Sequence, residues 1–171
     1  MQKLVLLALV AFSLNAVARN VTPIPPAPEK FGLGLVLGYP TAISGKYWID
    51  RSNAIDGGIG TFYDHYFLFY GDYLWHYPGW FGHRTEFLSQ LSAYWGVGGL
   101  LAMTTEVTDS NNKLRGTAAG TLGLGARAPF GAEWLPHNPR IGVFAEIGPG
   151  ISIIPNVGIL FFLGVGARYY F

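Results

Sequence analysis

Hydrophobic and polar residues alternate along the end of the chain, from Val157 to Phe171. Every second position counted back from Phe171 is apolar, whereas the intervening positions include three glycines and Arg168. Because successive side chains of a strand point to opposite faces, one face of this segment suits hydrocarbon and the other tolerates a charge. The pattern predicts one wall strand of a β-barrel that crosses a membrane.

Similar alternation recurs from Phe31 onward, and clusters of Pro, Gly, Asp and Asn interrupt it. These turn-forming residues separate eight predicted strands. We place the strands at residues 31–39, 41–49, 54–64, 66–76, 88–103, 117–128, 141–153 and 157–171. The proline-containing stretches 77–87 and 129–140 are expected to be connections. The sequence thus predicts an all-β fold, an eight-stranded antiparallel up-and-down transmembrane β-barrel with both termini on the periplasmic side.

Charged residues inside the predicted strands all share the parity opposite to the apolar rows. They are Lys46, Asp56, Asp64, Asp72, Arg127, Glu146 and Arg168. A charge on the lipid face near the bilayer midplane would cost roughly 2–4 kcal/mol, so this parity indicates the barrel interior. Eight strands leave an interior only wide enough for side chains. We expect these charges to pair in a plugged interior, with a narrow pore as an alternative.

Aromatic residues gather near the predicted periplasmic ends of the strands. They are Tyr47, Trp48, Trp75, Tyr77, Trp80, Phe81, Trp134, Tyr169 and Phe171. Tyrosine and tryptophan are enriched where a membrane meets water. This placement therefore favours a membrane-spanning barrel with an aromatic belt.

The N-terminal residues 1–18 have the features of a secretory signal. Lys3 supplies a positive charge, an apolar core follows, and a small-x-small motif ends at Ala18, after which we expect cleavage. Residues 19–30 contain several prolines and are expected to form an extended periplasmic leader. Residues 31–171 would then form the barrel, and the expected location is the bacterial outer membrane.

Composition agrees with this class of protein. Half of the residues are hydrophobic and 12% are charged, which is apolar for a soluble exported protein. Loss of Lys3 with the signal leaves equal numbers of basic and acidic residues, so no basic surface points to nucleic acid. The chain has no cysteine, which excludes disulfides and a cysteine-linked lipid anchor. We expect no cofactor.

Eight short segments, in this order, carry a resemblance to a known family. They are residues 38–41, 45–48, 53–56, 72–76, 94–98, 125–131, 144–150 and 166–171. Together they resemble a widespread bacterial family of small outer-membrane β-barrel proteins of unknown function, similar in architecture to the transmembrane domain of OmpA. The resemblance spans most of the chain from Phe31 and implies a fold and a location, with no reaction.

The last strand also resembles the C-terminal recognition strand of bacterial outer-membrane proteins, which typically ends in phenylalanine. That resemblance implies that Tyr169 and Phe171 form a signal for the outer-membrane assembly machinery. The other expected partners are outer-membrane lipids and lipopolysaccharide, and we expect the protein to be a monomer.

Candidate chemistry is sparse. A lipid A deacylase of the small-barrel type would need a His-x-Ser pair, which the sequence lacks. Asp109 and Ser110, with His65 at the same rim, leave an outer-membrane lipid acyltransferase as an alternative. His76, His83 and Glu86 match no zinc spacing. We expect no catalytic site and no metal site, and we expect the histidines to be interfacial.

The longest predicted outer loop, residues 104–116, is polar and is the candidate surface-binding loop. Its candidate residues are Glu106, Asp109, Ser110, Asn111, Asn112, Lys113 and Arg115. Loops on a rigid barrel are where binding usually resides. The sequence therefore favours a structural or surface-binding role without specifying a ligand.

Overall fold

The computed structural model of the protein describes residues 29–62, 66–104, 122–136 and 138–171. Most of this part of the chain is strand. The strands are β1 (Phe31–Tyr39), β2 (Thr41–Trp48), β3 (Asn53–Phe62), β4 (Tyr66–Pro78), β5 (Leu91–Thr104), β6 (Leu122–Arg127), β7 (Phe130–Trp134), β8 (Ile141–Ile154) and β9 (Gly158–Tyr170). One short helix, α1 (Glu86–Ser89), lies between β4 and β5.

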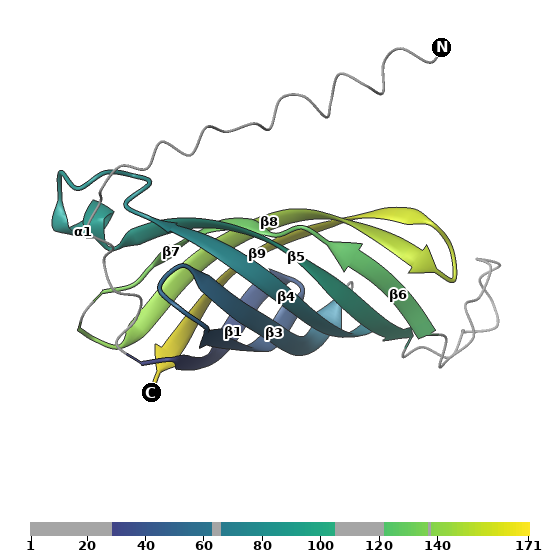
Figure 1. The fold of residues 1–171 in the computed structure, drawn as a ribbon. Helices are drawn as coiled ribbons and strands as arrows, with labels where there is room; N and C mark the ends of the chain where they lie inside the picture. The colour runs from purple at the N-terminus through teal and green to yellow at the C-terminus, as the bar shows by residue number, and fades with distance from the viewer. Residues whose placement is uncertain (1–28, 63–65, 105–121, 137) are drawn as a thin grey trace, which may run out of the picture.

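The strands close into a barrel in which every neighbouring pair is antiparallel (Figure 1). The first strand, β1, pairs with β2 on one side and with the last strand, β9, on the other. The pairing of β4 with β5 and of β8 with both β6 and β7 completes the circle. Closure leaves no unpaired sheet edge among the described strands, which is the condition for strands to cross a lipid bilayer.

The segments β6 and β7 form a single wall strand, interrupted only at Ala128 and Pro129. The register against β5 runs on without a shift from Gly98 opposite Arg127 to Trp95 opposite Phe130. The Gly96 amide still donates to the Pro129 carbonyl (2.8 Å), although Pro129 has no amide hydrogen of its own to offer. The barrel therefore has eight wall strands, as predicted.

The prediction that residues 129–140 form a connection was wrong for 130–134, which are β7. Proline normally ends a strand, so the sequence predicts that the strand stops at Pro129. The predicted start of the fifth strand at residue 88 was also early. Residues 86–89 form α1 instead, because the Thr85 hydroxyl accepts a hydrogen bond from the Leu88 amide (3.2 Å) and caps a helical turn.

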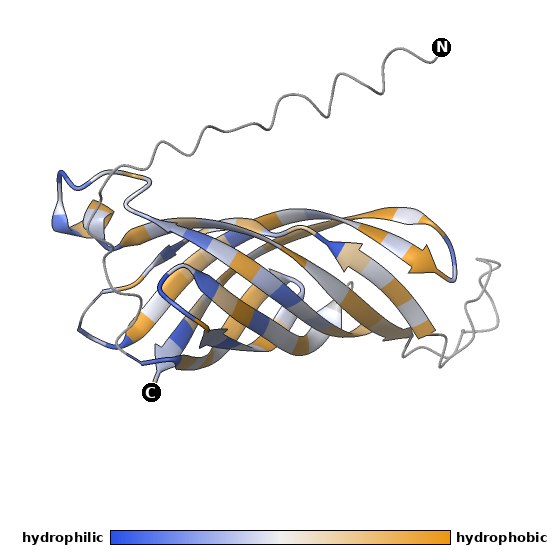
Figure 2. Cartoon of the chain, viewed as in Figure 1, coloured by the Kyte–Doolittle hydropathy of each residue, from blue (hydrophilic) through white to orange (hydrophobic). Residues whose placement is uncertain are grey.

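Apolar side chains cover the outside of the barrel, and Figure 2 shows hydrophobic and hydrophilic residues alternating along the strands. Leu35, Ile59 and Val165 are about half exposed, as are most outward residues of their strands. Burial of such side chains normally drives folding in water, so this surface is suited to hydrocarbon. The predicted transmembrane β-barrel fold is confirmed. No helix among the described residues is long and apolar enough to span a membrane.

The two ends of the barrel differ. The terminus end carries Phe171, the turn 49–52 and the connections 79–90 and 135–140, and the far end carries the turn at Pro40 (Figure 1). An apolar cluster of Trp48, Ala54 and Tyr170, with Leu135 packed against it, lies inside the terminus end. A second apolar cluster fills the interior toward the far end. It consists of Val36, Ala42, Leu68, Tyr70, Leu100, Phe144 and Phe162.

Candidate functional site

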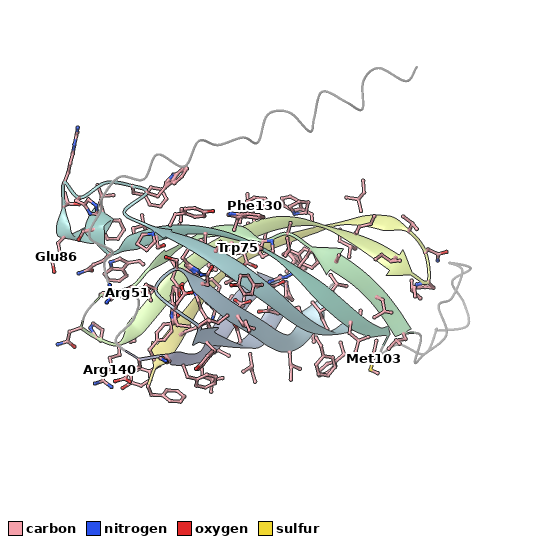
Figure 3. The ribbon with its side chains drawn as sticks, in the orientation of Figure 1. Arg51, Trp75, Glu86, Met103, Phe130 and Arg140 are labelled. Atoms are coloured by element: carbon pink, nitrogen blue, oxygen red, sulfur yellow. The ribbon has the colours of Figure 1, made fainter. Side chains whose placement is uncertain are left out.

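Polar side chains fill the interior between the two apolar clusters. The buried polar and charged residues are Ser44, Lys46, Asp56, Asp72, His76, Ser92, Arg127, Glu133 and Arg168. Five of the seven charges predicted for the interior are in this set. A sixth, Glu146, is also directed inward, and its side chain is only 11% exposed. The seventh, Asp64, lies outside the described residues. Figure 3 shows side chains with nitrogen and oxygen atoms between the walls of the barrel.

Glu133 on β7 is the centre of the first group of interior contacts, which we call the Glu133 cluster. Its Oε2 forms an ion pair with the Lys46 ammonium and lies 3.4 Å from His76 Nε2. Its Oε1 accepts a hydrogen bond from the Tyr170 hydroxyl (2.8 Å). Lys46 Nζ is also 2.8 Å from His76 Nε2. Both Lys46 and Glu133 have fully buried side chains, so each depends on the other for its compensating charge.

Arg168 on β9 connects this cluster to two neighbouring strands. Its guanidinium donates to the Ser44 hydroxyl (3.1 and 2.7 Å) and to the Asp56 carboxylate (2.7 Å). It also lies 3.9 Å from Glu133 Oε1. Hydrogen bonds between charged groups are about twice as strong as neutral ones, so Arg168 ties four wall strands together across the interior.

Arg127 on β6 is the centre of a second group, the Arg127 cluster. Its Nε donates to both Asp72 carboxylate oxygens (2.9 and 3.0 Å), and its second nitrogen pairs with the same carboxylate. Glu146 Oε1 lies 3.1 Å from the guanidinium, and the Tyr94 hydroxyl donates to Glu146 Oε2 (2.9 Å). Arg127 therefore binds two carboxylates at once, those of Asp72 and Glu146.

Aromatic rings face the interior cations. The Arg127 guanidinium lies 4.1 Å from the ring centre of Tyr70, and that of Arg168 lies 3.9 Å from the ring centre of Phe144. Lys46 Nζ lies 4.2 Å from the ring centre of Trp48. Cation–π contacts contribute most when both groups are removed from water, as here. The apolar clusters thus contact the charged layer directly at both of its ends.

His76 lies in the interior, so the expectation of an interfacial position was wrong for this residue. Its ring packs 4.5 Å from Trp48 and stacks on Tyr94 at 5.0 Å. His83 and Glu86, by contrast, are exposed in the connection 79–90. Within the described residues, no group of three or more His, Cys, Asp or Glu could hold a metal ion.

Two members of the Glu133 cluster were missed in the sequence. Glu133 and His76 both share the inward parity of their strands, with Glu133 continuing the odd-numbered row of Arg127 through Pro129. The alternation of the strands could therefore have identified both residues. Glu133 was missed because Pro129 predicts a strand end, which leaves residue 133 in a connection. For His76, its place near a strand end favoured the membrane interface.

Three buried polar atoms have no hydrogen-bond partner within the described part of the chain: Trp48 Nε1, Asp56 Oδ1 and His76 Nδ1. Glu133, His76 and Lys46 are groups that could exchange protons in principle. Each is fully or almost fully buried, however, and the apolar clusters lie on both sides of them. The arrangement is suited to holding the walls together rather than to receiving a substrate.

The remaining predicted site residues lie elsewhere. Tyr169 and Phe171 are about half exposed on the outside. The Phe171 amide donates to the Phe31 carbonyl (3.0 Å), and the two rings meet edge to face, so the last residue is fixed at the seam between β1 and β9. Their role as an assembly signal stays a prediction. All seven candidate residues of the surface-binding loop, including Asp109 and Ser110 of the enzyme alternative, lie outside the described residues.

Comparison with known proteins relates this chain to one class of fold. No protein-family model matches the sequence, and the curated proteins give no match. The structure is similar to the crystal structure of the N-terminal β-barrel domain of Pseudomonas aeruginosa OprF, with a TM-score of 0.60 and 14% sequence identity. The similarity covers 83% of this chain and 96% of that one. At this identity the similarity establishes the barrel fold, and the resemblance to a family of unknown function stays a prediction.

Proposed function

We propose that the protein is a small outer-membrane β-barrel with a structural or surface-binding role and a plugged, charge-paired interior. The observation that carries this proposal is the interior itself. Three cations and four carboxylates lie between two apolar clusters and contact one another directly. Such an interior stabilises a closed wall, and it leaves the loops and the outer surface as the places where a partner can bind.

The proposed topology follows from the termini. The segment 1–18 would be the export signal, cleaved after Ala18, and 19–30 the periplasmic leader. The terminus end of the barrel would then face the periplasm and the far end the cell exterior. The resemblance of the barrel to a domain of OprF and the apolar outer surface both support the outer-membrane location, and the orientation rests on the even number of wall strands.

Insertion into lipid is the first test. The protein without residues 1–18 is expected to fold in detergent or lipid into a strand-rich monomer that migrates differently in gels before and after heating. In planar bilayers, the same preparation should show no sustained conductance, because a plugged interior of ion pairs and apolar clusters would block the passage of ions. A helical far-ultraviolet spectrum would contradict the fold. Sustained conductance would show that the interior is not plugged and would favour the alternative of a narrow pore.

The surface-binding loop provides the second test. Trypsin added to intact cells is expected to cut after Lys113 or Arg115 while the barrel stays folded and keeps its heat-dependent migration. As a control, the exposed Arg140, at the end of the barrel proposed to face the periplasm, should be cut only in permeabilised cells. If the loop is cleaved only after the outer membrane is breached, the proposed topology is inverted.

A further inference from the structure

The connection 79–90, at the terminus end, exposes aromatic side chains beyond the barrel wall. Trp80 is 64% exposed, Phe87 on α1 is 55% exposed, and Phe81 between them is 41% exposed. The turn 49–52 at the same end is short and carries Arg51 (Figure 3). A connection of this length with three exposed aromatic rings is more than is needed to join β4 to β5.

This connection is ordered by hydrogen bonds of its own. The Gly82 amide donates to the Gly79 carbonyl (2.9 Å), and both glycines have positive φ angles that permit the tight turn. The Thr85 cap and a hydrogen bond from the Ser89 hydroxyl to the Glu86 carbonyl (2.7 Å) hold α1. The three rings are therefore presented on a defined backbone.

Both ends of the connection contact outward-facing aromatic residues of the barrel. At the β4 side, the Trp80 ring meets the Tyr77 ring edge to face, and the Tyr77 hydroxyl accepts a hydrogen bond from Trp95 Nε1 (3.0 Å). At the β7 side, the Phe87 ring lies 5.8 Å from that of Trp134. The exposed aromatic surface thus extends the lipid-facing side of the wall and does not turn toward the interior.

The lipid-facing wall adjacent to these contacts is itself aromatic. Trp95 stacks on Trp75 at 4.6 Å, and Trp75 lies 4.9 Å from Tyr73. Tryptophan and tyrosine rings prefer the headgroup level of a bilayer, where an apolar face and a polar group are both satisfied. The rings at this end thus form two groups, one from Tyr73 through Trp75, Trp95 and Tyr77 to Trp80 and one that joins Phe87 to Trp134, and each connects the lipid-facing wall to the connection 79–90.

We propose that the connection 79–90 is a membrane-binding element that lies in the phospholipid headgroup layer beside the terminus end of the barrel. Trp80, Phe81 and Phe87 enter the boundary between headgroups and acyl chains, and the exposed Arg84 is placed to contact lipid phosphates. The proposal rests on the proposed membrane location. It adds a phospholipid surface as the ligand of a segment outside the membrane-spanning strands.

The test uses single cysteine variants, because the chain has no cysteine of its own. Phe87→Cys would carry a nitroxide in the connection. Arg51→Cys, in the exposed turn at the same end, is the matched control for water, and Ile59→Cys, on the outward face of β3, is the control for hydrocarbon. The labelled proteins are inserted into vesicles of phosphatidylethanolamine and phosphatidylglycerol, and heat-dependent migration verifies that each has folded.

The measured quantity is the collision rate of each nitroxide with oxygen, which dissolves in lipid, relative to a water-soluble nickel complex. We expect the ratio at Phe87→Cys to be several-fold higher than at Arg51→Cys and lower than at Ile59→Cys. Equal ratios at residues 87 and 51 would overturn the proposal, because the aromatic surface would then be exposed to water and available to a protein partner instead of lipid. A water-like ratio at residue 59 would instead overturn the membrane location itself, and the present proposal with it.

A second measurement does not depend on a label. Dibrominated phospholipids quench tryptophan within contact distance, and the difference between the native protein and Trp80→Phe isolates the emission of Trp80. We expect bromines near the headgroup end of the acyl chains to quench this difference signal more strongly than bromines near the bilayer centre. An unquenched Trp80 signal in a folded barrel would overturn the proposal.

Discussion

Replacing Glu133 by alanine is expected to lower the free energy of unfolding by about 3–5 kcal/mol. The carboxylate is fully buried and contacts Lys46, His76 and Tyr170, with Arg168 slightly farther away. Its removal leaves the Lys46 ammonium in the interior without its carboxylate, where water cannot replace it. Urea unfolding of the protein in vesicles, followed by tryptophan fluorescence, measures the change.

Glu29→Ala is the matched control, because Glu29 also forms an ion pair but at the surface. Its Oε1 lies 2.8 Å from Arg140, and both side chains are at least one-third exposed. Exposed pairs of this kind contribute about 0–1 kcal/mol. Equal effects of the two substitutions would mean that the interior is hydrated, and the plugged interior would be wrong.

A double variant separates the loss of a partner from the loss of the pair. Lys46→Met with Glu133→Leu removes both charges and keeps apolar volume, and replacing a buried pair in this way is often neutral or even stabilising. We expect the double variant to be more stable than Glu133→Ala alone. A double variant that is less stable would show that Lys46 has a role independent of Glu133.

Alternation of side chains along the strands was enough to predict the inward face of the six charges that lie both in the predicted strands and among the described residues. Lys46, Asp56 and Arg168 were assigned to the interior by parity alone, and the structure places them there. Parity is reliable in this class of fold because the penalty for a wrong face is large on both sides of the wall. The same argument predicted eight strands and an apolar outer surface.

The partners of these charges could not be predicted in the same way. Lys46 lies directly opposite Asp56 in the ladder of β2 and β3, yet its ammonium pairs with Glu133 across the interior. Asp56 is in turn opposite Asp72, a like-charged neighbour that is unfavourable by itself. The two arginines resolve this conflict: Arg168 binds Asp56, and Arg127 binds Asp72. These choices depend on the stagger of the barrel, which sequence parity does not contain.

Pro129 explains why the sequence wrongly predicted a connection at residues 130–134, which form β7. A proline inside a strand removes a ladder hydrogen bond, so a break is the ordinary interpretation of the sequence. Here the Pro129 carbonyl still accepts from Gly96, and the Ala128 amide donates to the Pro149 carbonyl (3.0 Å). The wall therefore continues past the proline and brings Glu133 to Lys46. The continuation of the strand past Pro129 is thus what supplies the central carboxylate of the Glu133 cluster.

Gly98→Ala is expected to lower the free energy of unfolding by about 1–3 kcal/mol, an effect of overpacking. Gly98 faces the interior on β5, and a Cβ atom there would overlap the Asp72 carboxylate and the Gly71 carbonyl oxygen. To make room, Asp72 would have to leave its bidentate position on Arg127. Urea unfolding in vesicles again provides the measurement.

The neighbouring Gly99 is the matched control, because it differs from Gly98 in the face that it presents and in little else. A Cβ atom at Gly99 would meet only the Gly125 carbonyl oxygen, at an ordinary contact distance of 3.9 Å. Gly99→Ala should therefore be neutral or stabilise the protein by about 0.4–1 kcal/mol, since alanine reduces the freedom of the unfolded chain. A methyl group added on the outer face of β5 costs nothing in lipid, whereas one added inside must displace a charge. If both variants are equally stable, the interior has spare volume near Arg127, and a water-filled passage becomes the better description of this barrel.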